Sequence, residues 1–171
     1  MAAAYIHLFR FLIFTLLQIL VFNQLDVGFG IHLMIQPLFI MILPFEMTVI
    51  PLMGVGFGMG AIIDIFSNTF GLYTSSLVLL AYLRPIIFKL YGPREGYDPL
   101  KEPTINDMGF RWFSLVYGML LGLHTFWFFL LEMFELGRIG FILQKTILSG
   151  IFSFLLALLI QSFILKLKPR K

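Results

Sequence analysis

Long apolar segments recur along the whole chain and restrict its fold more than any other feature of the sequence. Charged residues make up only 12% of the chain and hydrophobic residues 60%, whereas a soluble domain carries about 25% charged residues. We therefore expect an integral membrane protein. The segments show no period-two alternation, which favours helices over barrel strands. The length of 171 residues predicts a single domain.

Six segments are candidates for membrane-spanning helices and predict a six-transmembrane-helix bundle. The second segment contains Pro37, and both it and the third are shorter than the roughly 20 residues of a straight span. Tilting, kinking or incomplete crossing of at least one of them therefore stays open. The expected spans are residues 5–22, 31–43, 48–65, 70–90, 108–131 and 141–165, with one polar loop at residues 91–107.

The Lys and Arg residues predict the orientation of these spans. Six crossings place both termini on one side with ten of these cations, against Arg138 and Lys145 on the other. Because cationic loops favour the cytoplasm, we expect a multi-pass inner-membrane protein with both termini cytoplasmic. A five-span arrangement with a re-entrant pair would leave one cationic cluster outside. The cations flank apolar spans, so we expect membrane lipid as a partner and no nucleic acid.

The segment from Gly54 to Gly71 differs most clearly from the other apolar segments, because it is rich in glycine and contains polar residues. Small or polar residues recur in it at steps of three or four, which places them on one helix face, and such a face lets another transmembrane helix approach closely. Asp64 has two open interpretations: a buried structural or interaction residue, or an ordinary interfacial acid. The predicted interface comprises Gly56, Gly60, Asp64, Ser67 and Gly71.

Two later spans carry similar stripes, and these also predict helix contacts. The facing helix belongs either to this chain or to a partner. The stripes are Ser114, Gly118 and Gly122 in the fifth span, and Ser149, Ser153, Ala157 and Gln161 in the sixth.

The polar loop contains three prolines, which exclude a continuous helix. Thr104 and Asp107 have the spacing of a capping box for the next helix. Docking of a cytoplasmic partner and a solvated connector are both open interpretations of this loop.

No motif predicts catalysis, a cofactor or a metal site. The chain has no Cys, and His7, His32 and His124 lie on different segments. Glu132 and Glu135 are best interpreted as solvated interfacial acids. A transporter is an alternative, because short, interrupted segments with an intramembrane acid are typical of substrate sites.

Several motifs together resemble the rod shape-determining MreD family, in its Bacteroidetes-type form. They are Leu43-Pro44-Phe45-Glu46, Gly60 to Gly71, Ala81 to Pro85 with Arg84 before that proline, Pro93-Arg94-Glu95-Gly96-Tyr97, Glu102-Pro103-Thr104 and Gly109 to Trp112.

The resemblance implies a non-enzymatic scaffold of the cell-elongation complex. Its implied partners are MreC, MreB, RodA and a penicillin-binding transpeptidase. It also implies a fold similar to the S component of energy-coupling-factor transporters, which keeps a small-molecule-binding transporter subunit as the alternative function.

Overall fold

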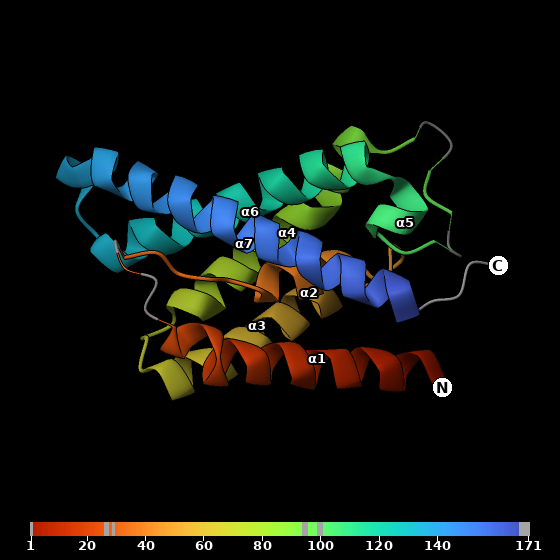
Figure 1. Cartoon of the computed structure of the whole chain (residues 1–171), viewed down its shortest axis with the longest axis horizontal. Helices are drawn as coiled ribbons and strands as arrows, with labels where there is room; N and C mark the ends of the chain where they lie inside the picture. Colours follow the sequence, from red (N-terminus) through yellow and green to blue (C-terminus); the bar gives the residue numbers. More distant parts are fainter. Residues whose placement is uncertain (1, 26–27, 29, 94–95, 99–100, 168–171) are drawn as a thin grey trace.

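The computed structural model describes residues 2–25, 28, 30–93, 96–98 and 101–167, and every regular element in this part of the chain is helical (Figure 1). Five helices are long: α1 (Ala2–Leu20), α3 (Val49–Ser67), α4 (Leu72–Tyr91), α6 (Phe110–Met133) and α7 (Ile139–Leu167). The short elements are η1 (Phe22–Gln24), α2 (Gln36–Ile42), α5 (Ile105–Met108) and η2 (Leu136–Arg138).

The five long helices, with η1 completing the first, are long and apolar enough to cross a membrane. The prediction of a helical multi-pass membrane bundle is therefore confirmed. The described residues contain five such helices, however, rather than the six expected. The difference lies in residues 31–43, which form an extended stretch followed by the 7 residues of α2.

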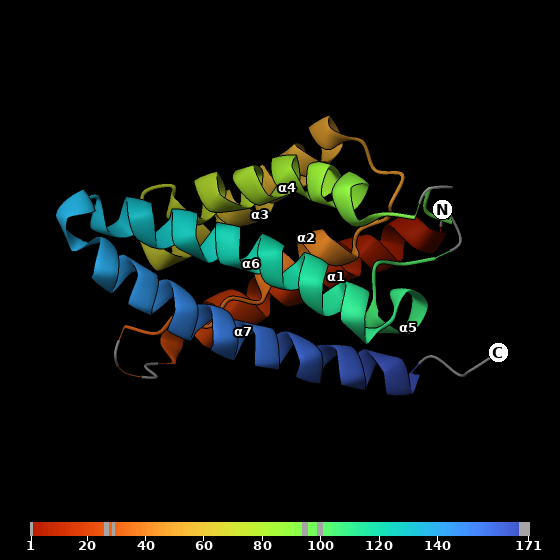
Figure 2. The ribbon, with the colours of Figure 1, turned by 90° about the horizontal axis from the view of Figure 1, so that it is seen from above.

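The long helices run roughly along a common axis, and the start of α1 and the end of α7 lie at the same end of the bundle (Figures 1 and 2). We call this the loop end, because it also holds α5 and the loop after α4. The opposite, hairpin end holds the α3–α4 turn and the connection from α6 to α7. Between α1 and α3 the chain returns to the loop end through the extended stretch and α2, so it makes six passes with only five long helices.

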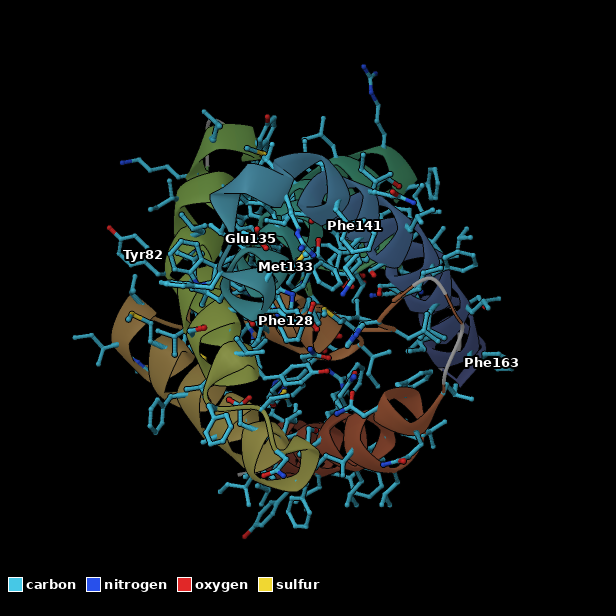
Figure 3. The ribbon with its side chains drawn as sticks, turned by 90° about the vertical axis from the view of Figure 1, so that its left-hand side faces the viewer. Tyr82, Phe128, Met133, Glu135, Phe141 and Phe163 are labelled. Carbon is cyan, nitrogen blue, oxygen red and sulfur yellow. The ribbon has the colours of Figure 1, made fainter. Side chains whose placement is uncertain are left out.

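The short helix α2 lies inside the bundle, and all of its residues are buried (Figure 2). Large apolar side chains also cover the outside. Tyr82 and Phe163 are 50% and 67% exposed and point away from the bundle, whereas Phe128 is 1% exposed and points to its middle (Figure 3). An apolar exterior around a packed interior is the distribution expected in lipid, where exposed apolar surface carries no penalty.

Candidate functional site

Asp64 joins the end of α3 to the start of α4. One carboxylate oxygen accepts hydrogen bonds from Thr69 Oγ1 at 2.7 Å and from the Tyr73 amide at 3.0 Å. The other accepts from the amide and hydroxyl of Thr74, at 2.8 and 2.6 Å. Tyr73 and Thr74 lie in the first turn of α4, whose amides have no partner within the helix. The buried carboxylate therefore caps a helix N-terminus from a neighbouring element.

The glycines of α3 that face α4 allow the two backbones to approach closely. A Cβ atom at Gly60 would lie 2.4 Å from the Cα atom of Thr74, and one at Gly56 would lie 3.0 Å from the carbonyl oxygen of Leu77. The helix that covers this face is thus α4 of the same chain. Ser67 lies elsewhere and accepts a hydrogen bond from Asn23, while Gly71 is the N-cap of α4 with φ +87°.

The extended stretch of residues 31–35 is held by side chains from two helices. The amides of His32 and Met34 donate to Ser149 Oγ and Ser153 Oγ of α7, at 3.0 and 2.9 Å. On the other side, the Gln18 amide group bonds the Leu33 carbonyl at 2.9 Å and the Ile35 amide at 3.0 Å. Non-helical backbone at membrane depth needs such partners. Ser149 and Ser153 therefore accept hydrogen bonds from this stretch within the chain. The sequence pattern predicts no role for Gln18.

Arg84 of α4 caps the C-terminal end of the buried helix α2. The Arg84 Nε and Nη2 atoms donate to the carbonyls of Met41, Leu43 and Pro44, which have no partner within α2. The guanidinium also lies over the Phe88 ring, 4.4 Å from its centroid. A cation at a helix C-terminus is favourable, and this residue is 1% exposed.

An aromatic cluster orders the described part of the polar loop. Tyr97 stacks on Phe45 at 4.2 Å, its hydroxyl donates to the Phe88 carbonyl at 2.7 Å, and Trp112 packs against both Phe88 and Tyr97. Burial raises the pKa of Tyr97, although the neighbouring Trp112 indole and Arg84 guanidinium oppose this shift.

Pro85, grouped with the loop by the family motif, lies inside α4 and is half-buried. In the loop itself, Pro103 and Thr104 are buried, Pro93 and Gly96 are exposed, and Arg94 and Glu95 lie outside the described residues. The capping box expected at Thr104 is wrong, because Thr104 makes no side-chain cap and Asp107 Oδ2 instead accepts from the Glu102 amide at 2.9 Å.

Gly118 and Gly122 form the floor of an outward-facing groove of about 350 Å³ between α6 and α7. A Cβ atom at Gly122 would have no neighbour within 4 Å, and one at Gly118 would meet only the Phe154 ring edge at 3.9 Å. In the described part of the chain no other helix covers this groove. We call it the α6–α7 groove; it is lined by Gly118, Leu121, Gly122, Thr146, Ile147, Gly150, Ile151, Phe154 and Leu155.

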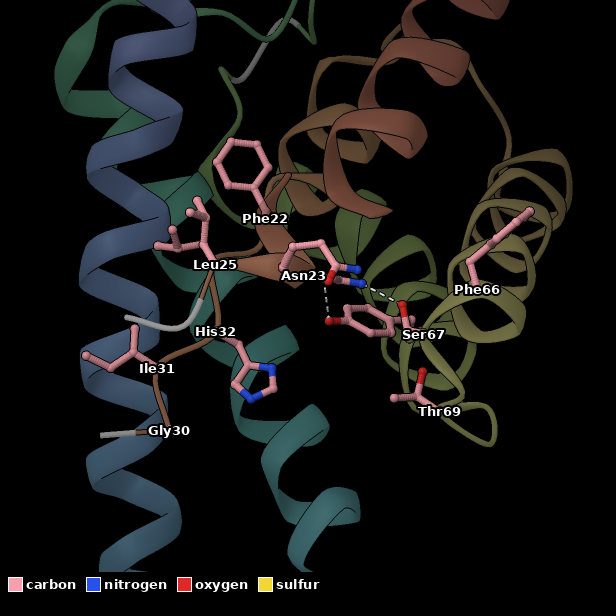
Figure 4. A pocket seen from close by; sticks show the side chains of 12 residues that line it. Phe22, Asn23, Leu25, Gly30, Ile31, His32, Phe66, Ser67 and Thr69 are labelled. Atoms are coloured by element: carbon pink, nitrogen blue, oxygen red, sulfur yellow. Dashed lines mark hydrogen bonds between the residues drawn. The ribbon is translucent and has the colours of Figure 1, made fainter. Parts of the chain in front are cut away.

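A second, polar cavity of about 420 Å³ opens at the hairpin end (Figure 4). Asn23 bonds Ser67 Oγ at 2.6 Å and accepts from the Tyr73 hydroxyl at 3.0 Å on one wall of it. His32 lies on another wall, 3.7 Å from Glu132, which is paired with Lys145 at 3.0 Å. We call this the hairpin-end cavity.

These side chains do not form a recognisable catalytic centre. Among the described residues, no group of three or more His, Cys, Asp and Glu side chains is placed to hold a metal ion. His124 is buried in α6, and neither ring nitrogen has a hydrogen-bond partner there. No family model, curated protein or solved structure matches this chain.

Proposed function

We propose that this chain is a non-enzymatic scaffold of the bacterial cell-elongation complex, with the role of an MreD-family protein in the inner membrane. In this role it binds MreC and links MreB to peptidoglycan synthesis by RodA and a penicillin-binding transpeptidase. The motifs at Leu43–Glu46, Gly60–Gly71 and Arg84–Pro85 support the family assignment. Asp64 and Arg84, two of the three charged members of those motifs, are engaged in capping helices of this chain.

One observation carries the scaffold proposal: the α6–α7 groove is floored by glycines that no element in the described part of the chain covers. In lipid, helices associate through close van der Waals packing over small residues, because apolar surface alone gives no drive. Gly118, Gly122 and Gly150 offer such a surface at helical spacing. We assign the transmembrane helix of MreC to this groove.

A second open glycine pair gives a competing face. A Cβ atom at Gly54 or Gly58 of α3 would have no neighbour within 4 Å, in contrast to Gly56 and Gly60 on the covered side. This pair has the same four-residue spacing but lies on a single helix, whereas the α6–α7 groove has walls from two helices. The α6–α7 groove is therefore the better candidate for a helix partner.

Two matched leucine variants test the assignment, since a Cβ atom at either glycine has no neighbour within 4 Å. We expect Gly122→Leu to reduce co-purification of MreC by at least about tenfold and to disturb rod shape, because it fills the groove. Gly54→Leu is the control and should leave both unchanged. Loss of MreC with Gly54→Leu alone would move the interface to α3. Normal MreC recovery with both variants would contradict binding at either face.

The cation distribution supports the orientation of the scaffold. The loop end carries Arg10, Lys89, Lys101 and Arg111, so cytoplasmic placement of this end follows from the preference of cationic loops. MreB would then meet the loop end and the bulk of MreC the hairpin end.

The hairpin-end cavity favours one second function, that of a small-molecule-binding subunit similar to a transporter S component. Its volume of about 420 Å³ lies within the range of ligand sites, and Asn23, His32 and Tyr73 present polar groups to it. A ligand of the folded state raises its thermal stability. A screen of vitamins against purified protein in detergent tests this function; stabilisation that is lost in Asn23→Leu would favour it over the scaffold.

A further inference from the structure

A third cavity lies at the loop end, where α4 ends above the turn between α2 and α3. Its volume is about 520 Å³, and its walls include Phe45, Arg84, Pro85, Phe88, Lys89 and Tyr97. Two of these six side chains are cationic and three are aromatic. No carboxylate is among the lining residues, so the only charge that the described walls present is positive.

Arg84 retains hydrogen-bonding capacity inside this cavity. An Arg side chain has five N–H donors, and its bonds to α2 use Nε and Nη2. Among the described residues, Nη1 has no hydrogen-bond acceptor and no carboxylate lies within ion-pair distance of the guanidinium. The carbonyls at the end of α2 supply only about half of a negative charge. A buried cation with two free donors therefore faces a cavity that an anion would complete.

The cavity lies beside lipid-facing surface. Tyr82, Ile86 and Leu90 form the adjacent stripe of α4 and are 50%, 51% and 68% exposed. Lys89, on the cavity wall, is exposed in the last turn of this spanning helix, and the ends of a spanning helix reach the headgroup region. Basic pockets at this depth are typical of sites for phospholipid headgroups.

We propose that the Arg84 cavity binds the phosphate of an anionic phospholipid. The phosphate accepts from Arg84 Nη1 and pairs with Lys89, while Pro85 and Phe88 contact the glycerol and the first methylenes of the acyl chains. Arginine suits this role because its planar donors match a phosphate oxyanion. The site is distinct from the α6–α7 groove and does not depend on the scaffold proposal.

A tryptophan reporter tests this proposal directly. The chain has 2 Trp residues, and Trp112 packs against the Phe88 and Tyr97 walls at 5.5 and 5.8 Å. Trp127→Phe removes the other, whose indole nitrogen makes no hydrogen bond. In nanodiscs, phosphatidylglycerol brominated near the glycerol should quench Trp112 more strongly than equally brominated phosphatidylcholine at the same mole fraction. Equal quenching by both lipids would overturn the proposal.

Two variants distinguish a specific site from general surface charge, and a competitor distinguishes phospholipid from free phosphate. Arg84→Gln also removes the cap of α2, so the informative variant is Lys89→Gln, which should weaken the preference for phosphatidylglycerol about fivefold. Lys101→Gln, an exposed cation outside the cavity, is the control and should leave the preference intact. An equal loss in both variants would show only general surface charge and overturn the site. Displacement by inorganic phosphate, at an ionic strength matched with chloride, would assign the cavity to free phosphate and overturn the lipid.

Discussion

At the residue scale, Asp64 and Arg84 each cap a helix end, and their charges are opposite. Asp64 accepts from the first amides of α4, and Arg84 donates to the last carbonyls of α2. Each charge has the sign that the helix dipole favours at that end. An unsatisfied helix end is costly where water is scarce, so both side chains stabilise the junctions that they close.

The first prediction concerns Asp64. We expect Asp64→Ala to lower the free energy of unfolding by about 2–4 kcal/mol, because the amides of Tyr73 and Thr74 lose their acceptor. Asp64→Asn should recover part of this loss, since one oxygen remains. Unfolding by SDS in mixed micelles, followed by circular dichroism, measures the change. Glu46→Ala removes an exposed acid with no hydrogen bond that the structure describes and serves as the control; an equal effect of both variants would contradict the capping role.

The sequence indicated the importance of Asp64 but not its partners. Its acceptor role depends on amides 9 and 10 residues further along the chain, so helical spacing alone pointed to a face and not to a cap. A family motif singles out Arg84 but does not predict its partners. Its acceptors lie 40 to 43 residues earlier in the chain, at the end of a helix that the apolar pattern did not resolve.

At the element scale, alternate glycines give α3 two different sides. Gly56 and Gly60 meet the backbone of α4, whereas Gly54 and Gly58 face open space. Only the first pair is required for the antiparallel α3–α4 contact. The spacing of four correctly grouped Gly56 with Gly60, but four glycines at alternate positions contain two such pairs, and the sequence does not say which pair is covered.

The second prediction compares one glycine from each side. Gly60→Ala should lower the free energy of unfolding by about 1–3 kcal/mol, because its Cβ atom would overlap the Thr74 backbone and force the helices apart. Gly58→Ala should instead raise it by about 0.5–1 kcal/mol through better helix propensity. Both variants change the same residue type in the same helix, and SDS unfolding measures both. The same sign of change in both would contradict the assigned faces.

The extended stretch shows why one expected segment is not a long helix. Residues 31–43 are apolar enough for a helix. However, the amides of residues 32 and 34 donate to Ser149 and Ser153. Gln18 bonds the carbonyl of residue 33 and the amide of residue 35. Alternate outward groups are a strand-like feature. The partners come from α1 and α7, far away in the sequence, so no local pattern could favour this conformation over a helix.

At the scale of the whole molecule, the path of residues 30–43 sets the topology. Asn23 meets Ser67 and Tyr73 at the hairpin end, whereas Pro44 and Phe45 meet Arg84 and Tyr97 at the loop end. The chain therefore crosses the bundle between these two contacts without a long helix. As a result, the start of α1 and the end of α7 lie at the same end of the bundle (Figures 1 and 2).

The last prediction tests this path with single cysteines, which the absence of native Cys makes practical. Gln24→Cys, Glu46→Cys and Gly137→Cys all lie at exposed positions outside the long helices. In intact spheroplasts, a membrane-impermeant maleimide should label Gln24→Cys and Gly137→Cys, and permeabilisation should expose Glu46→Cys. Gln24→Cys and Glu46→Cys decide the topology, because a 30–43 segment that failed to cross would leave both of them on one side and Gly137→Cys on the other. Labelling of Glu46→Cys alone in intact spheroplasts would instead reverse the proposed orientation of the whole bundle.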